Sequence, residues 1–268
     1  MDKIKLRDID IERFQRLNNQ GLNSTCYTDG NICIKMIDDL YPEEKETLKI
    51  KLLEMDGINI DGVITPTGLI LENDTLEGII SPYFKESKSF LTHFEQSRYI
   101  SSKELLLALK KASLILRNLH NNNIIYQDIN FANILIDNTG NIKYCDIDSC
   151  SYKGYESPYI SVFLSNYMLY YRKEKNIEIS KNNDRLSLLL AFFELIYRKE
   201  LQKVSSRQYN SLSKQIKTLE NCRKYVEILK NKGKNIPEIP YIDELIEDSD
   251  NEYIDRYKQL GIIRRILG

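Results

Sequence analysis

Three oxygen-bearing side chains in the middle of the chain have types and spacings that suit chemistry on a phosphate group. Asn133 lies five residues beyond Asp128, and Asp146 directly follows the apolar run "IKYC", residues 142–145. Carboxylate and amide oxygens are hard ligands of the kind that Mg²⁺ binds. A carboxylate placed beside an attacking hydroxyl orients that hydroxyl and accepts its proton. These residue types therefore indicate transfer of a phosphoryl group to a hydroxyl with the help of a metal.

Lys35 is the candidate cation for the phosphates. It interrupts an apolar strand-like run, "ICIKM", that follows a strong hairpin signal at residues 29–31. Because an unpaired charge is costly to bury, its ammonium group needs an anionic partner, which nucleotide phosphates and a helix glutamate would provide. The alternative is a lysine on an edge strand that points to solvent.

The elements that must position these residues fall into two groups. Up to about residue 90 the pattern predicts short strands and one helix. The helix is "PEEKETLKIKLLEM", with a proline near its start and an apolar stripe at Leu48, Leu52 and Met55. A second hairpin is predicted over residues 68–84, turning at residues 73–74.

From residue 101 the pattern becomes mainly helical. The stretch "SSKELLLALKKASLILRNLH" opens with a capping-box pattern, and its apolar residues follow one helical face: Leu105, Leu109, Ala112, Leu116 and Leu119. Two short strands around a turn at residues 138–141 come next. The run "DRLSLLLAFFELIY" is apolar on nearly every side and predicts a central buried helix.

Composition restricts the class of partner. Lys and Arg total 38 against 39 acidic residues, for a net charge of −1, which does not indicate nucleic acid or an anionic membrane as a partner. The five cysteines have no metal-ligand spacing and are expected to be reduced and at least partly buried. No signal peptide is recognised, and the most apolar run is too short to span a bilayer. We expect a cytoplasmic protein, and the oligomeric state stays open.

Several motifs resemble those of the protein kinase family over roughly residues 15–200. "LHNNNIIYQDINFANILID" is similar to the catalytic loop LHxxxxxHRDxxxxN, "IKYCDIDSC" to the DFG stretch and "ICIKM" to the V-A-I-K strand. The resemblance implies that Asp128 and Lys35 are catalytic, with Lys35 on the ATP phosphates. It implies that Asn133 and Asp146 bind Mg²⁺.

The resemblance also implies a partner for Lys35 on the first helix. We assign Glu46, because Ile50 and Leu53 follow it at the four- and seven-residue offsets typical of that helix in the family. Glu43 and Glu44 are competing candidates.

The family's glycine-rich cover over the nucleotide corresponds to "LNNQGLNSTCYTDG", which keeps only one of the usual three glycines. There, Gly21, Asn23 and Ser24 are implied to direct backbone amides at phosphate. Cys26 stands where a valine usually covers the adenine. Farther along, Asp184 matches the residue that anchors the catalytic-loop backbone in the family.

The chain also departs from the family pattern. HRD has become Tyr126-Gln127-Asp128, which removes the arginine that usually pairs with a phosphate on the activation segment. Asn130 replaces the lysine found two residues after the catalytic aspartate in Ser/Thr kinases. DFG has become Asp146-Ile147-Asp148, a DxD pattern that resembles a subset of bacterial kinase-like proteins. Asp148 is either an additional acceptor or metal ligand, or a turn residue that caps its own backbone.

We therefore predict an α+β, bilobal, protein-kinase-like fold. Residues 1–84 form a small lobe with an antiparallel sheet and one helix, and residues 85–268 form a larger, mainly α-helical lobe. The predicted function is an ATP- and Mg²⁺-dependent protein kinase of Ser/Thr type, of bacterial or phage style, that acts on a hydroxyl of a protein substrate. The alternatives are a small-molecule, aminoglycoside-like kinase and a nucleotide-binding pseudokinase.

Overall fold

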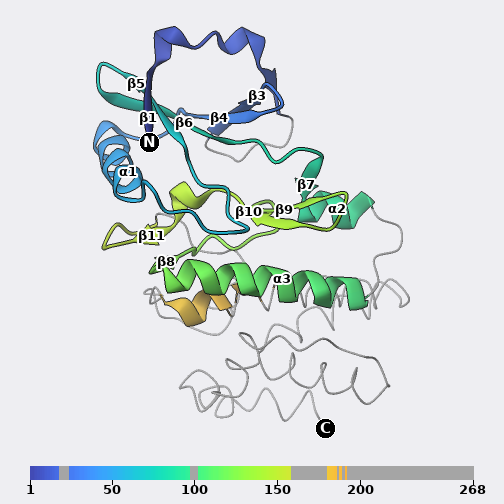
Figure 1. Cartoon of the computed structure of the whole chain (residues 1–268). Helices are drawn as coiled ribbons and strands as arrows, with labels where there is room; N and C mark the ends of the chain where they lie inside the picture. Colours follow the sequence, from blue (N-terminus) through green and yellow to red (C-terminus); the bar gives the residue numbers. More distant parts are fainter. Residues whose placement is uncertain (18–23, 97–101, 158–179, 186, 189–190, 192–268) are drawn as a thin grey trace, which may run out of the picture.

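The computed structural model describes residues 1–17, 24–96, 102–157, 180–185, 187–188 and 191 (Figure 1). The strands are β1 (Asp2–Lys5), β2 (Gln15–Arg16), β3 (Ser24–Thr28), β4 (Ile32–Ile37), β5 (Gly68–Glu72), β6 (Thr75–Pro82), β7 (Ser87–Ser89), β8 (Ile124–Ile125), β9 (Ile134–Asp137), β10 (Ile142–Tyr144) and β11 (Ser151–Tyr152). The α-helices are α1 (Pro42–Glu54), α2 (Phe90–Gln96) and α3 (Ser102–Asn121), and the 3₁₀ turns are η1 (Leu6–Asp8), η2 (Ile11–Arg13) and η3 (Ile147–Ser149). Residues 181–185 are helical as well.

The largest sheet has six strands in the order β1-β5-β6-β4-β3-β2. All neighbouring pairs are antiparallel except β1 and β5, which run parallel with Asp2 opposite Gly68. The predicted antiparallel sheet is therefore wrong in this respect, because the sheet is mixed. Hairpin signals predict pairing only between strands that are neighbours in sequence. Strand β1 pairs with a strand more than sixty residues away, which such signals do not predict.

Both predicted hairpins of this sheet are confirmed. Between β3 and β4, the carboxylate of Asp29 accepts hydrogen bonds from the backbone amides of Asn31 and Ile32 at 2.8 and 3.0 Å. Between β5 and β6, Asn73 and Asp74 both have a positive φ, which two-residue hairpin turns require. The first turn sets the register that places Lys35 opposite Cys26 on β3. On its other side, Lys35 lies opposite Ile79 on β6.

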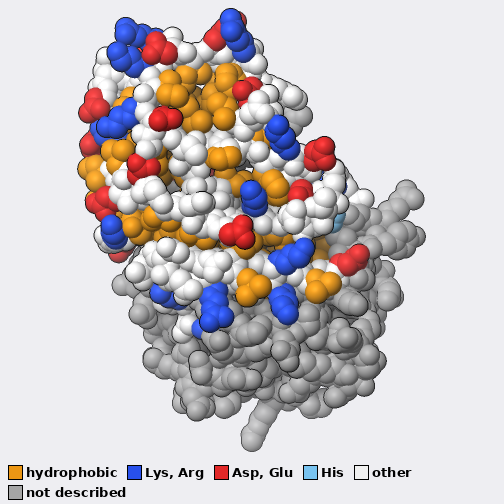
Figure 2. All heavy atoms as spheres, in the orientation of Figure 1, with side chains coloured by type: hydrophobic (Ala, Val, Ile, Leu, Met, Phe, Trp, Pro, Cys, Tyr) orange, Lys and Arg blue, Asp and Glu red, His pale blue; other side chains and the backbone are white. Residues whose placement is uncertain are grey.

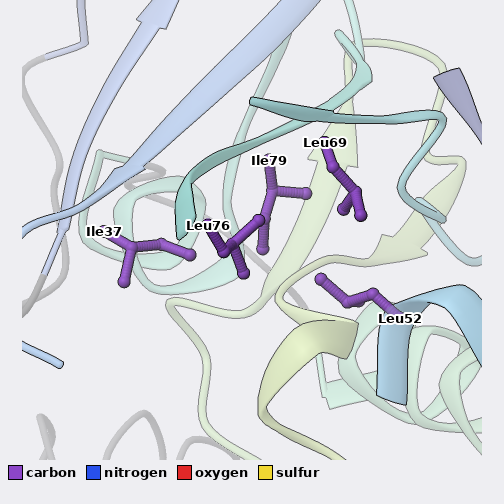
Figure 3. Close-up of a cluster of buried hydrophobic side chains, with 5 residues drawn as sticks. All are labelled: Ile37, Leu52, Leu69, Leu76 and Ile79. Carbon is purple, nitrogen blue, oxygen red and sulfur yellow. The ribbon is translucent and has the colours of Figure 1, made fainter. Parts of the chain in front are cut away.

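Helix α1 packs against one face of this sheet. Pro42 starts the helix, and the carboxylate of Glu44 accepts a hydrogen bond from the backbone amide of Tyr41 at 2.8 Å. Leu52 is buried with apolar side chains of β4, β5 and β6 in the cluster shown in Figure 3, which consists of Ile37, Leu52, Leu69, Leu76 and Ile79. The predicted apolar stripe is confirmed, since Leu48 packs against this cluster and Met55 is buried.

The N-terminal segment covers the opposite face of the sheet. Its two 3₁₀ turns, η1 and η2, arch over the strands at the top of the molecule (Figure 1). Hydrophobic side chains gather below this arch, with charged side chains along its rim (Figure 2). Buried Ile34, Ile70 and Ile80 form the centre of this second cluster, and the partly buried residues around them are Ile4, Leu6, Ile9, Ile11, Phe14, Tyr27, Ile32 and Met36.

Helix α3 is the long helix that lies below the three-stranded sheet in the view of Figure 1. Its predicted apolar face is confirmed, because the five residues of that face are all fully buried: Leu105, Leu109, Ala112, Leu116 and Leu119. A three-stranded sheet, β10-β9-β7, lies against it, and the hydroxyl of Tyr144 on β10 donates to the carbonyl of Ala112 at 3.2 Å. The predicted hairpin around residues 138–141 is β9–β10, held by the carboxylate of Asp137, which accepts hydrogen bonds from Thr139 and Asn141.

The loop after α1 joins the two halves of the described structure. The backbone amide of Tyr144 donates to the carbonyl of Gly62, and the amide of Ile64 donates to the carbonyl of Tyr144, both at 2.8 Å. Gly62 has a φ of +80°, and a Cβ at this position would lie 2.5 Å from Cγ1 of Ile115 on α3. Only glycine allows this close approach in this backbone conformation.

We predict that Gly62→Ala lowers the free energy of unfolding by about 2–4 kcal/mol, since overpacking against Ile115 adds to the cost of a left-handed residue. Gly57→Ala is the matched control, because Gly57 has a φ of +79° and nothing within 4 Å of the added Cβ. The control is expected to lose only about 1–2 kcal/mol, the backbone cost. Urea unfolding measures both, and equal losses would contradict the close approach.

Candidate functional site

A cleft of about 770 Å³ lies between the six-stranded sheet with α1 and the loops that follow α3. Its lining includes Ser24, Lys35, Asp128, Asn133 and Asp146, five of the residues predicted for the site. The other lining residues are Ile37, Leu40, Glu43, Glu44, Thr47, Leu48, Lys51, Asn130, Ala132, Asp148, Ser149, Tyr155, Glu156 and Ser157.

Two of the remaining predicted residues, Gly21 and Asn23, lie outside the described residues. Cys26 is half-buried on β3, directly opposite Lys35, and its side chain therefore lies on the same face of the sheet as Lys35. A hydrogen bond with Cys33 and burial both raise the pKa of the Cys26 thiol, which stays neutral. None of the four described cysteines is in a disulfide.

Lys35 forms a short ion-pair triad with the turn after β10. Its Nζ lies 2.6 Å from Oδ1 of Asp146 and 2.8 Å from Oδ2 of Asp148. Burial alone would lower the pKa of Lys35, but Asp148 and Asp146 outweigh it and hold this pKa well above its ordinary value. Burial raises the pKa of Asp146, and the charge of Lys35 opposes that change. The ammonium group therefore stays charged inside the cleft.

The predicted pair between Lys35 and Glu46 is wrong for this structure. The side chain of Glu46 is 53% exposed, and its carboxylate lies 2.7 Å from Nζ of Lys49. Glu46 stands two residues, or about 200° around the helix, from Leu48, whose side of α1 faces the sheet and the cleft. The offsets typical of the family therefore selected a residue on the side of α1 that faces away from Lys35. Ile50, one of the two residues on which that choice was based, is 40% exposed.

Two asparagines hold the carboxylate of Asp128. Nδ2 of Asn130 donates to Oδ1 at 3.1 Å, and Nδ2 of Asn133 donates to Oδ2 at 2.9 Å. Oδ1 of Asn130 also accepts from the backbone amides of Ala132 and Asn133. Asn130, which replaces a cation of the family, thus helps to orient the proposed catalytic carboxylate.

The donor atoms of Asn133 and Asp146 fit a hard divalent cation. Asn133 uses its amide nitrogen on Asp128, so its amide oxygen is available as a neutral ligand, and Asp146 provides a carboxylate in the same cleft. In the described part of the chain, no group of three or more His, Cys, Asp or Glu side chains forms a metal site by itself. Two protein ligands suit Mg²⁺, which keeps waters and takes further ligands from substrate phosphates.

Asp184 anchors the backbone that leads into Asp128. Its carboxylate accepts hydrogen bonds from the backbone amides of Tyr126 and Gln127 at 2.6 and 2.8 Å, and Oδ2 also lies 3.0 Å from Nε2 of His120. Asp184 is 2% exposed and His120 is 1% exposed. The predicted anchoring contacts of Asp184 are therefore present.

The residues that replace the family's histidine and arginine also have structural partners. The hydroxyl of Tyr126 donates to the carbonyl of Cys145, next to Asp146, and the Tyr126 ring contacts Tyr144 edge-on. Oε1 of Gln127 accepts from the hydroxyl of Ser151 and, at 3.3 Å, from the backbone amide of Ser157. The segment after Asp146 is therefore attached to the catalytic loop by uncharged hydrogen bonds.

Lys51 was missed from the sequence, whereas an acceptor role was one of the alternatives left open for Asp148. Asp148 was left open as an acceptor, a metal ligand or a turn residue, and the structure pairs it with Lys35. Lys51 was not singled out, although the apolar stripe through Leu48, Leu52 and Met55 places it on the inner side of α1. A lysine at an inner helix position was the available signal.

The comparisons with known proteins agree with this geometry. The model of the protein kinase domain family matches residues 25–253. The chain belongs to the protein kinase domain family. Over 105 residues, or 39% of the chain, it is 27% identical to the G protein-coupled receptor kinase 2 of Caenorhabditis elegans. That match spans 15% of the length of the relative.

Among the described residues, no helix is long and apolar enough to cross a bilayer.

We predict that Asp184→Ala lowers the free energy of unfolding by about 3–5 kcal/mol, because it leaves buried donors of the catalytic loop without their carboxylate. Asp184→Asn keeps an acceptor oxygen and is expected to lose less. Asp61→Ala, at an exposed position, is the control and should stay within about 0.5 kcal/mol of the parent. Thermal and urea unfolding measure the series, and an Asp184→Ala protein as stable as the control would refute the anchoring role.

Proposed function

We propose that the protein is an ATP- and Mg²⁺-dependent kinase that transfers the γ-phosphate to a serine or threonine hydroxyl of a protein substrate. The observation that supports this most strongly is the convergence of Lys35, Asp128, Asn133 and Asp146 on one cleft, from segments separated by up to 111 residues. Membership of the protein kinase domain family supports the same reaction class.

The proposed work of each residue follows from its charge and surroundings. Lys35 presents an ammonium group to the nucleotide phosphates, and Ser24 at the edge of the cleft offers polar contacts above them. Asn133 and Asp146 would hold Mg²⁺ through hard oxygen atoms. When bound, the metal neutralises charge on the phosphates and orients them for in-line transfer.

Asp128 is proposed to position the nucleophile. Its two carboxylate oxygens are held by Asn130 and Asn133, so the group is fixed in orientation before any substrate arrives. A carboxylate in this place orients the substrate hydroxyl and accepts its proton as the phosphoryl group is transferred. We further propose that residues 1–84 and 85–268 act as the two lobes that enclose the nucleotide.

One observation favours a second candidate, a kinase for a small molecule with amino groups. The wall of the cleft includes Glu43, Glu44 and Glu156 in addition to the aspartates of the proposed site, and acidic walls attract cationic acceptors. A basic peptide and a small hydroxylated amine would both suit them. Parallel transfer assays with the two classes of acceptor separate these candidates.

A third possibility, a nucleotide-binding pseudokinase, is tested by catalysis. The purified protein is incubated with γ-labelled ATP, Mg²⁺ and generic protein acceptors, and incorporation of label is measured. Incorporation above that of a chelated control supports a kinase. Saturable binding of ATP with Mg²⁺, without incorporation into any acceptor or into the protein itself, would overturn the proposed function.

Two substitutions separate the roles in the site. Asp128→Asn is expected to reduce transfer at least about 100-fold, the usual range for loss of a general base, while the Kd for ATP with Mg²⁺ changes little. Asp146→Asn is expected to weaken Mg²⁺-dependent ATP binding as well, by about tenfold or more. Label transfer and equilibrium nucleotide binding are the two measurements.

Asp39→Asn is the matched control, since it makes the same chemical change at an exposed position outside the cleft. It should retain the parent's transfer rate and ATP affinity. An Asp128→Asn protein with the activity of this control would remove Asp128 from the proposed mechanism.

A further inference from the structure

Lys35 takes both of its carboxylate partners from the turn after β10, and helix α1 contacts that same turn through a lysine. We propose that Asp148 is the carboxylate that holds Lys35 for the nucleotide phosphates, in place of a glutamate of α1, and that Lys51 positions the turn that carries Asp148. The proposal rests on the proposed kinase function.

The first step concerns the two carboxylates that share Lys35. If Asp146 binds Mg²⁺, as proposed, its negative charge serves the metal and no longer serves Lys35 alone. The side chain of Lys35 is only 19% exposed, so its ammonium group still requires a carboxylate within the cleft. Asp148, with a side chain 13% exposed and an oxygen 2.8 Å from Nζ, is already in place.

The second step concerns the acidic residues of α1. The carboxylate of Glu44 accepts a hydrogen bond from the amide of Tyr41 at the start of the helix. Glu46 pairs with Lys49 on the outer side. One and two turns beyond Glu44, the inner positions carry Thr47 and Lys51. Within the described residues, the carboxylates that pair with Lys35 come from the turn after β10 and not from α1.

The third step concerns Lys51. Its Nζ donates to the backbone carbonyls of Asp148 and Cys150, at 2.6 and 2.9 Å, and the residue is 4% exposed. The first carbonyl lies within η3 and the second belongs to the residue directly after it, and η3 follows Asp146, which has a φ of +61°. Lys51 therefore holds the backbone of Asp148 toward α1 while the Asp148 side chain reaches Lys35 on β4.

The proposed contacts form a chain. Lys51 of α1 binds the backbone of the turn, Asp148 of the turn pairs with Lys35, and Lys35 would bind the nucleotide phosphates. Lys51 acts through the backbone of the turn that carries Asp148, so it is a positioning residue. Burial lowers the pKa of Lys51, and the hydrogen bonds from its ammonium group to two carbonyls of the turn offset the cost of placing this charge at an inner helix position.

The test of Asp148 is Asp148→Asn, which preserves size and removes the charge. The expected result is a rise of about tenfold in the Kd of a fluorescent ATP analogue with Mg²⁺, the effect of losing one charge-assisted contact. The parent is measured in parallel for binding and for transfer of label. Unchanged affinity in Asp148→Asn would overturn the proposal, as would an equal or larger loss in Glu46→Gln.

The test of Lys51 uses three substitutions on α1, two at Lys51 and one at Lys45. Lys51→Met is expected to raise the KM for ATP and to speed amide hydrogen exchange in residues 147–152, whereas Lys51→Arg retains both parental values. Lys45→Met is the matched control, because Lys45 is a mostly buried lysine of the same helix that pairs with Glu77 at 2.7 Å, away from the turn. Equal exchange in residues 147–152 for Lys51→Met and Lys45→Met would overturn the positioning role.

The two proposals fail in different ways. A parent protein that binds the nucleotide but transfers no phosphate overturns the kinase function and leaves the binding comparison of Asp148→Asn with the parent intact. If Asp148→Asn transfers phosphate as fast as the parent and binds ATP with the same affinity, only the assignment of Asp148 is overturned. A parent that does not bind ATP overturns both.

Discussion

The arrangement of the cleft depends on one buried cation shared by two carboxylates. Lys35 comes from the middle of a hydrophobic sheet, and its charge is stable there only because Asp146 and Asp148 lie within 2.8 Å. The same contacts join β4 to the turn after β10, so the proposed phosphate-binding and metal-binding groups are brought together by their own electrostatics. A nucleotide bound as proposed would compete for these charges, which would link its binding to the proposed binding of metal by Asp146.

The rest of the described structure keeps this contact in place from several sides. Helix α1 is fixed on the sheet by the cluster around Leu52, and from there Lys51 reaches the carbonyls of the turn. Gly62 lets the following loop pass close to α3 and bond to β10. Below the cleft, Asp184 fixes the backbone before Asp128 through buried hydrogen bonds. The contacts of Lys51, Gly62 and Asp184 involve backbone atoms, so they do not depend on which side chains stand at Tyr126 and Gln127.

Features with local causes were predictable from the sequence, and features with distant causes were not. Turn residues predicted both hairpins of the sheet, and the apolar periodicity predicted α1 and α3. Lys35, Asp128 and Asp146 were identified because the residues next to them in sequence resemble motifs of the protein kinase family. The predicted partner of Lys35 was wrong because the family offsets selected Glu46, which lies on the side of α1 opposite to Leu48. The pairing of Lys35 with Asp148, 113 residues away, and that of β1 with β5 depend on tertiary folding alone.

The most direct test of the central claim is the thermal stability of the parent and of Lys35→Met with and without ATP and Mg²⁺. At about 100 times the Kd, binding to the folded protein should raise the Tm of the parent by roughly 5–10 °C. Without Mg²⁺, or in Lys35→Met, the rise should be much smaller, because either the metal or the lysine charge proposed to bind the phosphates is missing. An equal rise in the parent and Lys35→Met, or no rise in the parent, would contradict the account.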